Sequence, residues 1–468
     1  MKNYTRGSII LLVIVFGAIF FTLLIALSGF VLAQNRAQND TRSKSEAFNI
    51  AEAGLDHYRW YLSHFPGDIT DGTGHAGPYV HTFHDPEGGT AGNYSLSIIG
   101  NSACGVIQSV DVASVGVASD TPSISTSLWA RYARPSVARY NMILNASVWF
   151  GPGAIYGALH SNGGIRMDGE PDAPITSSVS TWTCDSSFGC SPNRAVAGVF
   201  GSGTNMNMWQ YPTPQVDFAS IASSFSSLKT TSVASGLYFP RVSSAANSHI
   251  GYHFIFNNAN TVTVKKVTSV TTLSSYPADM SSGGYVNDYN FTNNEVLIGT
   301  YAIPPTCGVI FVEDNAWIEG TLAQKVTFVA ANVTNPGVYP NIVLKNNLLY
   351  TAYDGSVGFT AIASHNILIA PEAPVNLTLD GIFVAQSGTF GTNLYNNTYP
   401  AYTHKGNLNM LGTVVCLLRP VVYWSYGGGK WSGYPGGVSV FDRQNSTNPP
   451  PFTPTTSTQW QFVDWQQK

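Results

Sequence analysis

The side chains best suited to chemistry are the carboxylates between residues 313 and 380. Enzymes that cut polysaccharides need two or three carboxylates, with Lys or Arg, converging on one face. Glu313 and Glu319 are an even number of residues apart and could share a strand face, with Lys325 and Lys345 as the nearest cations. The other candidates are Asp314, Asp354 and Asp380.

Turn chemistry argues against an enzyme. Asp314-Asn315 and Asp354-Gly355 are dipeptides typical of turns, which favours structural roles for both aspartates. His160 in LHSNGG has no Ser/Asp or Cys arrangement beside it, so we predict a corner histidine. We therefore predict that the protein is not an enzyme. A membrane-anchored, polysaccharide-active enzyme is the alternative.

Motifs for cofactors and metals are missing from the sequence. The stretch YGGGK lacks the Ser or Thr after Lys that a phosphate-binding loop requires. The five cysteines form no CxxC or Cys/His spacing, and no loop matches an EF-hand, although a calcium ion at residues 313–315 stays open. We predict no cofactor and no metal.

A Gly-rich aromatic segment near the C-terminus, YWSYGGGKWSGY, is the candidate binding patch. Aromatic rings on a Gly-rich loop can stack on sugars or other surfaces. Packing of the same rings onto the neighbouring strands is the alternative. The patch consists of Tyr423, Trp424, Tyr426, Trp431 and Tyr434.

Composition points outside the cytoplasm. Only 10% of residues are charged, and Gly, Ser, Thr, Asn and Tyr supply much of the polarity, which suits an extracytoplasmic, β-rich protein. The net charge of −4 gives no basic face, so nucleic-acid binding is not implied. Cys184 and Cys190 are close enough in sequence to form a small disulfide loop, whereas Cys104, Cys307 and Cys416 could be buried thiols or long-range pairs.

The N-terminal residues predict one long helix with two characters. Residues 8–33 carry no charge, a run longer than the roughly 20 residues that span a bilayer. It also exceeds the apolar core of a secretory signal, about 7–15 residues, so ordinary signal cleavage is disfavoured. Further on, Phe48, Ala51, Leu55, Tyr58 and Leu62 recur every three or four residues and form one apolar stripe on a helix.

That stripe requires a packing partner. The segments GNYSLSIIG, CGVIQSVDVASVGVASD and SISTSLWARYARP predict short strands with alternating apolar residues. A three- or four-stranded antiparallel sheet packed on the helix is the simplest arrangement.

This N-terminal pattern resembles a type IV pilin-like protein, closest to PilX-type minor pilins and the K-class pseudopilins of type II secretion. The resemblance covers roughly residues 1–135 and rests on Arg6-Gly7-Ser8, the apolar helix, and the continuation FNIAEAGL. It implies that a prepilin peptidase cuts between Gly7 and Ser8. It also implies that the helix is the assembly element, with Leu12, Phe48, Glu52 and Leu55 as its assembly residues.

One position departs from the major pilins of this family. These carry Glu at the fifth mature position, which is Leu12 here. PilX-type and K-class proteins commonly lack this Glu too, so the resemblance implies a minor subunit at the tip or at initiation. The implied partners are other pilins, the pilus assembly machinery and the cytoplasmic membrane.

The remaining sequence predicts many very short strands with asparagine at the turns. A loose unit recurs at Asn162–Gly169, Asn315–Gly320 and Asn407–Gly412. Short strands with apolar inward positions and corner asparagines, which can form side-chain hydrogen-bond ladders, favour a β-solenoid. A β-sandwich or barrel is the alternative. This part of the sequence also resembles β-helical regions found fused to PilX-type N-termini in bacterial proteins. Because the function of those regions is largely unassigned, the resemblance adds little about activity.

The predicted fold is thus an α+β pilin-like module followed by a mainly-β domain, a right-handed β-helix or, alternatively, a β-sandwich. An insertion holds one helix, beginning near Asp217, and a hairpin over residues 251–267. We expect five segments: leader 1–7, helix 8–64, antiparallel sheet 65–135, β-solenoid 136–443 with the insertion at about 170–305, and 444–468 as a Pro/Thr strap and closing strand.

The sequence predicts a non-enzymatic minor pilin-like subunit. It would be a single-pass cytoplasmic membrane protein with an extracytoplasmic domain that reaches the pilus or the cell surface. There the β-domain would bind a surface glycan, a cell receptor or another partner. A static cell-envelope protein is a further alternative.

Overall fold

The computed structural model describes residues 8–221, 224–245, 248–335, 337–395, 399–426 and 430–468. It divides the chain into two units. The first comprises the described part of Met1–Gly100, with Ser109–Tyr132 and Gln461–Lys468. The second comprises Asn101–Gln108 and Ala133–Trp460. A long helix followed by a mainly-β region confirms the broad fold class predicted from sequence.

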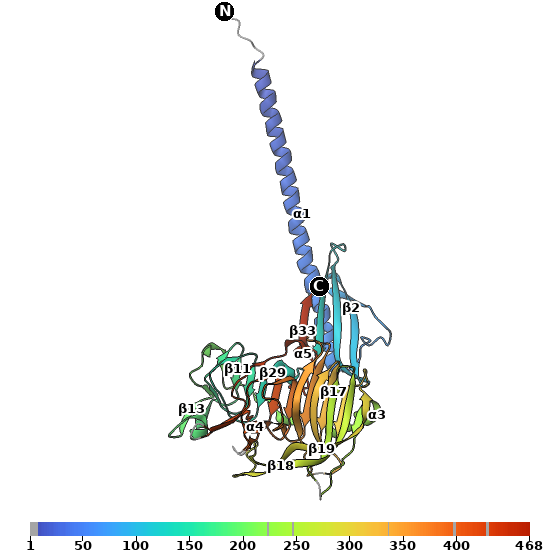
Figure 1. Ribbon diagram of the computed structural model, residues 1–468. Helices are drawn as coiled ribbons and strands as arrows, with labels where there is room; N and C mark the ends of the chain where they lie inside the picture. The colour runs from blue at the N-terminus through green and yellow to red at the C-terminus, as the bar shows by residue number, and fades with distance from the viewer. Residues whose placement is uncertain (1–7, 222–223, 246–247, 336, 396–398, 427–429) are drawn as a thin grey trace, which may run out of the picture. The chain divides into compact units, whose positions relative to one another are not determined.

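The first unit is one helix with one antiparallel sheet. Helix α1 spans Ser8–His64, and its N-terminal part stands clear of the sheet, whereas β2 lies alongside its C-terminal part (Figure 1). The sheet has five strands where sequence predicted three or four, because the C-terminal strand joins the edge next to β4. In order across the sheet these are β1 (Tyr79–His84), β2 (Thr90–Ala103), β3 (Val106–Ala118), β4 (Ser125–Ala133) and β33 (Gln461–Gln467).

The second unit is built on columns of short parallel strands. The longest column runs through ten strands in the order β16 (Leu237–Phe239), β20 (Val309–Val312), β22 (Lys325–Ala330), β24 (Gly358–Ala363), β26 (Leu377–Ala385), β29 (Leu408–Cys416), β5 (Met142–Leu144), β8 (Leu159–Ser161), β11 (Ile175–Ser177) and β15 (Trp209–Gln210). A second column contains β17 (Gly251–Asn257), β21 (Asn315–Leu322), β23 (Ile342–Tyr350), β25 (Ile367–Ile369) and β27 (Phe390–Gly391).

Chain order and column order differ. The early strand β5 pairs with the late strand β29, with Val414 opposite Met142. The chain then passes through α2 (Phe218–Ile221) and α3 (Phe225–Ser235) to β16 at the far end of the column. Since β11, β16 and β17 pair in parallel with strands outside 170–305, that range is not simply an insertion.

Phenylalanine rings fill the space between the two columns. Phe254 and Phe328 are fully buried with ring centroids 4.9 Å apart, and Phe383 lies 5.6 Å from Phe390. Because parallel strands stack in register, equivalent inward positions meet in successive strands and form one continuous core.

Corner asparagines join successive strands of the second column. The side-chain oxygen of Asn315 accepts from the Asn341 backbone N–H at 3.0 Å, and that of Asn341 accepts from the Asn366 N–H at 3.0 Å. Asn366 in turn accepts from the Thr389 N–H at 2.8 Å. This ladder confirms the predicted role of corner asparagine, because each amide satisfies a backbone donor left free at a turn.

Antiparallel hairpins extend from these columns. The largest is formed by β17, β18 (Thr261–Tyr276) and β19 (Val286–Ala302), whose first pair is the predicted hairpin. The other short elements are β6 (Val148–Phe150), β7 (Ala154–Ile155), β9 (Ile165–Met167), β10 (Glu170–Pro171), β12 (Thr181–Cys184), β13 (Arg194–Ala197), β14 (Val199–Phe200), β28 (Leu394–Tyr395), β30 (Tyr423–Tyr426), β31 (Lys430–Gly433), β32 (Ser439–Val440), α4 (Pro400–Thr403) and α5 (Arg443–Thr447).

Candidate functional site

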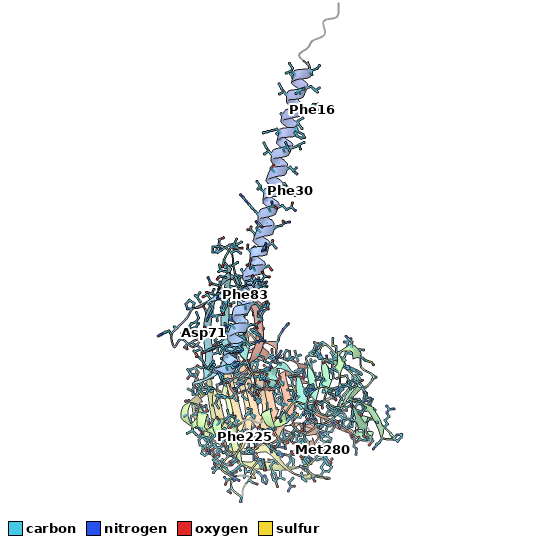
Figure 2. The ribbon with its side chains drawn as sticks, turned by 180° about the vertical axis from the view of Figure 1, so that it is seen from behind. Phe16, Phe30, Asp71, Phe83, Phe225 and Met280 are labelled. Atoms are coloured by element: carbon cyan, nitrogen blue, oxygen red, sulfur yellow. A yellow bond between two sulfur atoms is a disulfide. The ribbon has the colours of Figure 1, made fainter. Side chains whose placement is uncertain are left out.

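The N-terminal half of α1 presents apolar side chains to its surroundings. Leu12 is 55% exposed and Phe16 63%. Figure 2 shows Phe16 and Phe30 projecting from the part of α1 that stands clear of the sheet. Within the described residues, α1 is the one helix long and apolar enough to cross a membrane. A stretch of this length without charge suggests a single-pass membrane anchor.

The C-terminal half of the same helix is buried beneath the sheet. Ala51, Leu55, Tyr58 and Leu62 of the predicted stripe have almost no exposed surface. Phe48 is only half-buried and lies edge-on to Trp465 of β33, with centroids 6.2 Å apart. Glu52 is on the exposed face.

Glycines set the distance between helix and sheet. A Cβ at Gly54 would lie 2.4 Å from the Ser114 Oγ and 2.8 Å from the Tyr94 ring. A Cβ at Gly116 of β3 would lie 2.2 Å from the Ala47 carbonyl oxygen. Such short approaches leave no room for a side chain: sheet side chains pack onto the helix at Gly54, and the strand backbone packs onto the helix backbone at Gly116.

A buried tyrosine fixes the helix further. The Tyr132 hydroxyl donates to the Leu55 carbonyl oxygen at 2.6 Å. Burial, with Asp56 nearby, raises the pKa of Tyr132 far above its ordinary value, so the hydroxyl remains a donor. Leu55 thus contributes to attachment of the sheet within its own chain.

The predicted processing site lies at the edge of what the structure describes. Gly7 is outside the described residues, and Ser8 is the first residue of α1.

A cluster of two histidines and an aspartate, which sequence did not indicate, lies in the first unit. His57 of α1, Asp71 of the loop after it and His81 of β1 bring their metal-binding atoms within 4.8 Å of one another. The three residues are 14 and 10 positions apart, and no known ligand spacing connects them. Only the fold brings them together.

The aromatic segment forms a hairpin, β30 with β31. Tyr423 is 42% exposed and lies 6.1 Å from the half-buried Trp431, whose ring stacks on His404 at 4.2 Å. Trp424 is half-buried and donates from Nε1 to the Thr392 carbonyl at 2.8 Å.

Tyr434 and Tyr426 complete the predicted patch. Tyr434 is 3% exposed, and its hydroxyl donates to the Pro374 carbonyl at 2.8 Å, so it packs inside the unit. The Tyr426 side chain lies outside the described residues. The candidate patch at the surface is therefore Tyr423 with Trp431.

Glu313 and Glu319 do not share a face. Glu313 precedes β21, accepts from Lys229 Nζ at 2.9 Å and from the Tyr238 hydroxyl at 2.6 Å, and is buried. Burial would raise the pKa of Glu313, but these two donors outweigh burial and hold the pKa below its ordinary value. Glu319, within β21, instead lies 3.0 Å from His253 Nε2.

His253 is the centre of a buried ionic network between β17, β19, β21 and β23. Its Nδ1 lies 3.0 Å from Glu295, which also accepts from Lys345 Nζ at 2.7 Å. Burial would lower the pKa of His253, but Glu295 and Glu319 outweigh burial and raise it. Likewise burial would raise the pKa of Glu295, but His253 and Lys345 lower it.

The three candidate aspartates from the sequence accept hydrogen bonds from backbone N–H groups. Asp314 accepts from the Val242 and Ser243 N–H groups at 2.9 and 2.7 Å. Asp354 accepts from the Ser356 N–H at 2.9 Å, as its turn pair predicts. Asp380 is 2% exposed and accepts from the Tyr350 N–H at 3.0 Å, while burial raises its pKa.

Two further sequence candidates also have local roles. Lys325 donates from Nζ to the Asn448 carbonyl at 2.6 Å, away from the carboxylates that it was considered with. His160 is buried at 2.8 Å from the Thr176 hydroxyl and 3.0 Å from the Asn162 side chain, and burial lowers its pKa. Its place beside a turn asparagine matches a corner histidine.

Two disulfides lie in the second unit. Cys184 pairs with Cys190, six residues later, and Cys104 pairs with Cys307 over a separation of 203 residues. Cys416 is a buried free thiol, and burial raises its pKa to about 12. A thiol this weakly acidic and inaccessible is a packing residue.

Comparison with known proteins gives similarity to solved structures but no family. No protein-family model matches the chain, and no curated protein matches it in sequence. A solved structure of the competence-associated pilin ComZ from Thermus thermophilus is similar over 91% of this chain and 97% of its own, at 14% identity and a TM-score of 0.32. At that TM-score the similarity carries no functional argument, which rests instead on the geometry described above.

Proposed function

We propose that this protein is a minor type IV pilin-like subunit that displays a mainly-β domain for binding. The observation that carries the proposal is the division of α1. Its first half exposes apolar side chains, as a membrane or filament interior requires, and one face of its last turns, from Ala47 to Leu62, is buried under an antiparallel sheet. A plain membrane anchor needs only the first half.

The leader of the chain supports processing by a prepilin peptidase. We propose cleavage between Gly7 and Ser8, which would release the leader and make Ser8 the first residue of the assembly helix. Leu12 cannot neutralise a neighbouring subunit's terminal amine as a carboxylate would, so the subunit would occupy the tip or initiate the filament. Its partners would be other pilins and the assembly machinery.

The second unit would be a β-solenoid that binds rather than transforms its ligand. Support comes from the in-register parallel columns and from the asparagine ladder. The candidate carboxylates Glu313, Asp314 and Asp380 are already engaged by Lys229, Tyr238 and backbone N–H groups. We propose Tyr423 and Trp431 as the stacking surface for a glycan or receptor.

Processing is tested by the N-terminal mass of the membrane-extracted protein. Wild type should begin at Ser8, and Gly7→Val should retain the leader and fail to enter sheared filaments. Gly283→Val is the control, because Gly283 lies outside α1 and a Cβ there meets nothing within 4 Å. An intact Met1 terminus in wild type, with the protein retained by cells after shearing, would overturn the proposal in favour of a static envelope protein.

A further inference from the structure

Three side chains from separate elements converge in the first unit. The Asp71 Oδ2 lies 2.5 Å from His81 Nε2, and Asp71 Oδ1 lies 3.5 Å from His57 Nε2. The two imidazole rings are 4.7 Å apart. Figure 2 labels Asp71 in the loop beside the sheet-bearing part of α1. The three groups thus present two nitrogen ligands and one carboxylate to a common point.

The Asp71 carboxylate is buried without enough donors. Its side chain is 1% exposed, and within the part of the chain that the structure describes Oδ1 accepts no hydrogen bond. A buried carboxylate oxygen without a donor costs free energy, and natural proteins rarely keep one. A bound cation would satisfy that oxygen.

The loop holds Asp71 in place at a backbone cost. Asp71 has φ 51°, a left-handed conformation uncommon for a residue with a side chain. The neighbouring Asp68 fixes the loop to the helix, since it accepts from the Tyr61 hydroxyl at 2.6 Å and its carbonyl accepts from the Tyr58 hydroxyl at 2.7 Å. The carboxylate is therefore pre-positioned rather than free to turn outward.

The imidazole rings are also oriented by their neighbours. Tyr94 stacks on His81, with centroids 5.1 Å apart and planes 21° from parallel, and lies 5.9 Å from His57. The two histidines retain 32% and 33% exposed side chains, so solvent reaches the cluster from one side. A site with three protein ligands and one open side matches a cation that also holds water.

We propose that Nε2 of His57, Nε2 of His81 and the carboxylate of Asp71 bind a divalent first-row transition metal, with Zn²⁺ as the representative ion. Two imidazoles exclude a calcium-type site, which uses oxygen ligands, and suit zinc and its neighbours. Metal–ligand bonds of about 2.0–2.2 Å place tetrahedral ligands roughly 3.3 Å apart, close to the 3.5 Å between Asp71 and His57. The His81 contact would lengthen.

Metal binding here would clamp three elements of the first unit. His57 belongs to α1, His81 to β1, and Asp71 to the connection between them. One ion would therefore tie the helix to the edge strand of the sheet, in the module that we propose to enter a filament. The clamp does not depend on that role, since it rests on geometry within one chain.

The test is a metal titration of the full chain in detergent. Zn²⁺ competition against a chromophoric chelator should give one equivalent per chain, and Co²⁺ should give the visible absorption of a four- or five-coordinate site. His57→Gln, His81→Gln and Asp71→Asn should each weaken binding by at least about 10-fold. His84→Gln is the matched control, because His84 is an exposed residue of β1, the strand that carries His81. This variant should bind Zn²⁺ like wild type.

Thermal unfolding distinguishes lost ligands from lost folding. The Tm in EDTA shows whether each variant folds without metal, and saturating Zn²⁺ should raise the Tm above that value for wild type and His84→Gln only. If one variant fails to fold, the remaining two carry the test. Less than one equivalent of Zn²⁺ in wild type, or an unchanged affinity in His57→Gln and His81→Gln, would overturn the proposal and leave an ordinary His–Asp ion pair.

Discussion

Different kinds of contact stand out inside each of the two units. In the first, α1 meets the sheet through closely packed apolar surface, with Gly54 and Gly116 setting the distance. In the second, buried charged groups join neighbouring layers, as Glu313 does with Lys229 and Glu295 with Lys345. These charged groups of the second unit are therefore paired with one another within the fold.

This difference locates where chemistry can still occur. The carboxylates that sequence singled out in the second unit all have donors, so they stabilise structure. Among the described residues, Asp71 Oδ1 in the first unit and Glu372 Oε2 in the second are buried carboxylate oxygens that accept no hydrogen bond, and Asp71 lies in a cluster with two imidazoles. A functional carboxylate is thus better sought by its unpaired atoms than by its position in a motif.

The largest effect should come from breaking a buried ion pair in the second unit. Glu313→Ala removes the partner of Lys229 and Tyr238, and we expect a loss of about 3–4 kcal/mol in the free energy of unfolding. Urea denaturation monitored by hydrogen exchange over β20 and β22 measures it. Glu170→Ala, at an exposed position of the same unit, should cost less than about 0.5 kcal/mol. Equal losses would show that the ion pair is dispensable.

The next effect should come from overfilling the helix–sheet contact of the first unit. Gly54→Val forces atoms into the Ser114 and Tyr94 side chains, so we expect a loss of about 2–3 kcal/mol. Gly29→Val, on the same helix where a Cβ meets nothing within 4 Å, should leave the unit intact. Hydrogen exchange of β2 and β3 reports the difference. A tolerated Gly54→Val would mean that the close approach is not needed.

The ionic network should make the stability of the second unit depend on pH near neutrality. The raised pKa of His253 means that its stabilisation is complete below its unfolded value of about 6.5 and is lost as pH rises through the folded pKa. The hydrogen bond to His253 lowers the pKa of Glu319 and outweighs burial, which would raise it. The stabilisation from Glu319 is therefore lost as pH falls from about 4.3, the unfolded pKa, through the lower folded pKa.

We therefore expect the free energy of unfolding of wild type relative to His253→Gln to decline by on the order of 1 kcal/mol from pH 5.5 to above neutrality. Urea titrations of both proteins at each pH give the difference, in which the other titrating groups cancel. A difference that is flat over this range would contradict the assigned role of His253.

The smallest effect should come from a single hydrogen bond in the first unit. Tyr132→Phe removes the donor to the Leu55 carbonyl while preserving the ring, so the expected loss is about 1 kcal/mol. Denaturant-dependent exchange of β4 measures it. A loss above about 3 kcal/mol would show that the first unit depends on polar contacts as strongly as the second.

Local patterns predicted much of the fold. The uncharged run and the stripe from Ala51 to Leu62 predicted α1, because the periodicity of apolar residues within a short segment indicates both a helix and its buried face. Corner asparagines predicted the ladder for the same reason.

Contacts between distant segments could not be predicted. The pairing of β5 with β29 joins strands that are far apart in the sequence. The alternation of apolar residues in a strand is the same whichever strand it pairs with, so periodicity cannot predict this neighbour. The cluster of His57, Asp71 and His81 depends on a left-handed backbone at Asp71 and on the register of β1, neither of which its residue types reveal. Among the residues of the helix–sheet contact, Leu55 was predicted from its spacing. The roles of Gly54 and Gly116 in that contact can be recognised only from the structure, which shows how close the neighbouring atoms lie.

The position of β33 has a consequence for how the protein is made. The edge of β4 is covered by Gln461–Gln467, yet residues 133–460 are synthesised between them. As the chain emerges from N to C, α1 and four strands precede the second unit, and the sheet keeps an open edge until the last strand arrives. An open edge invites pairing with foreign strands. A chain interrupted anywhere in the second unit would therefore leave the edge of β4 unpaired.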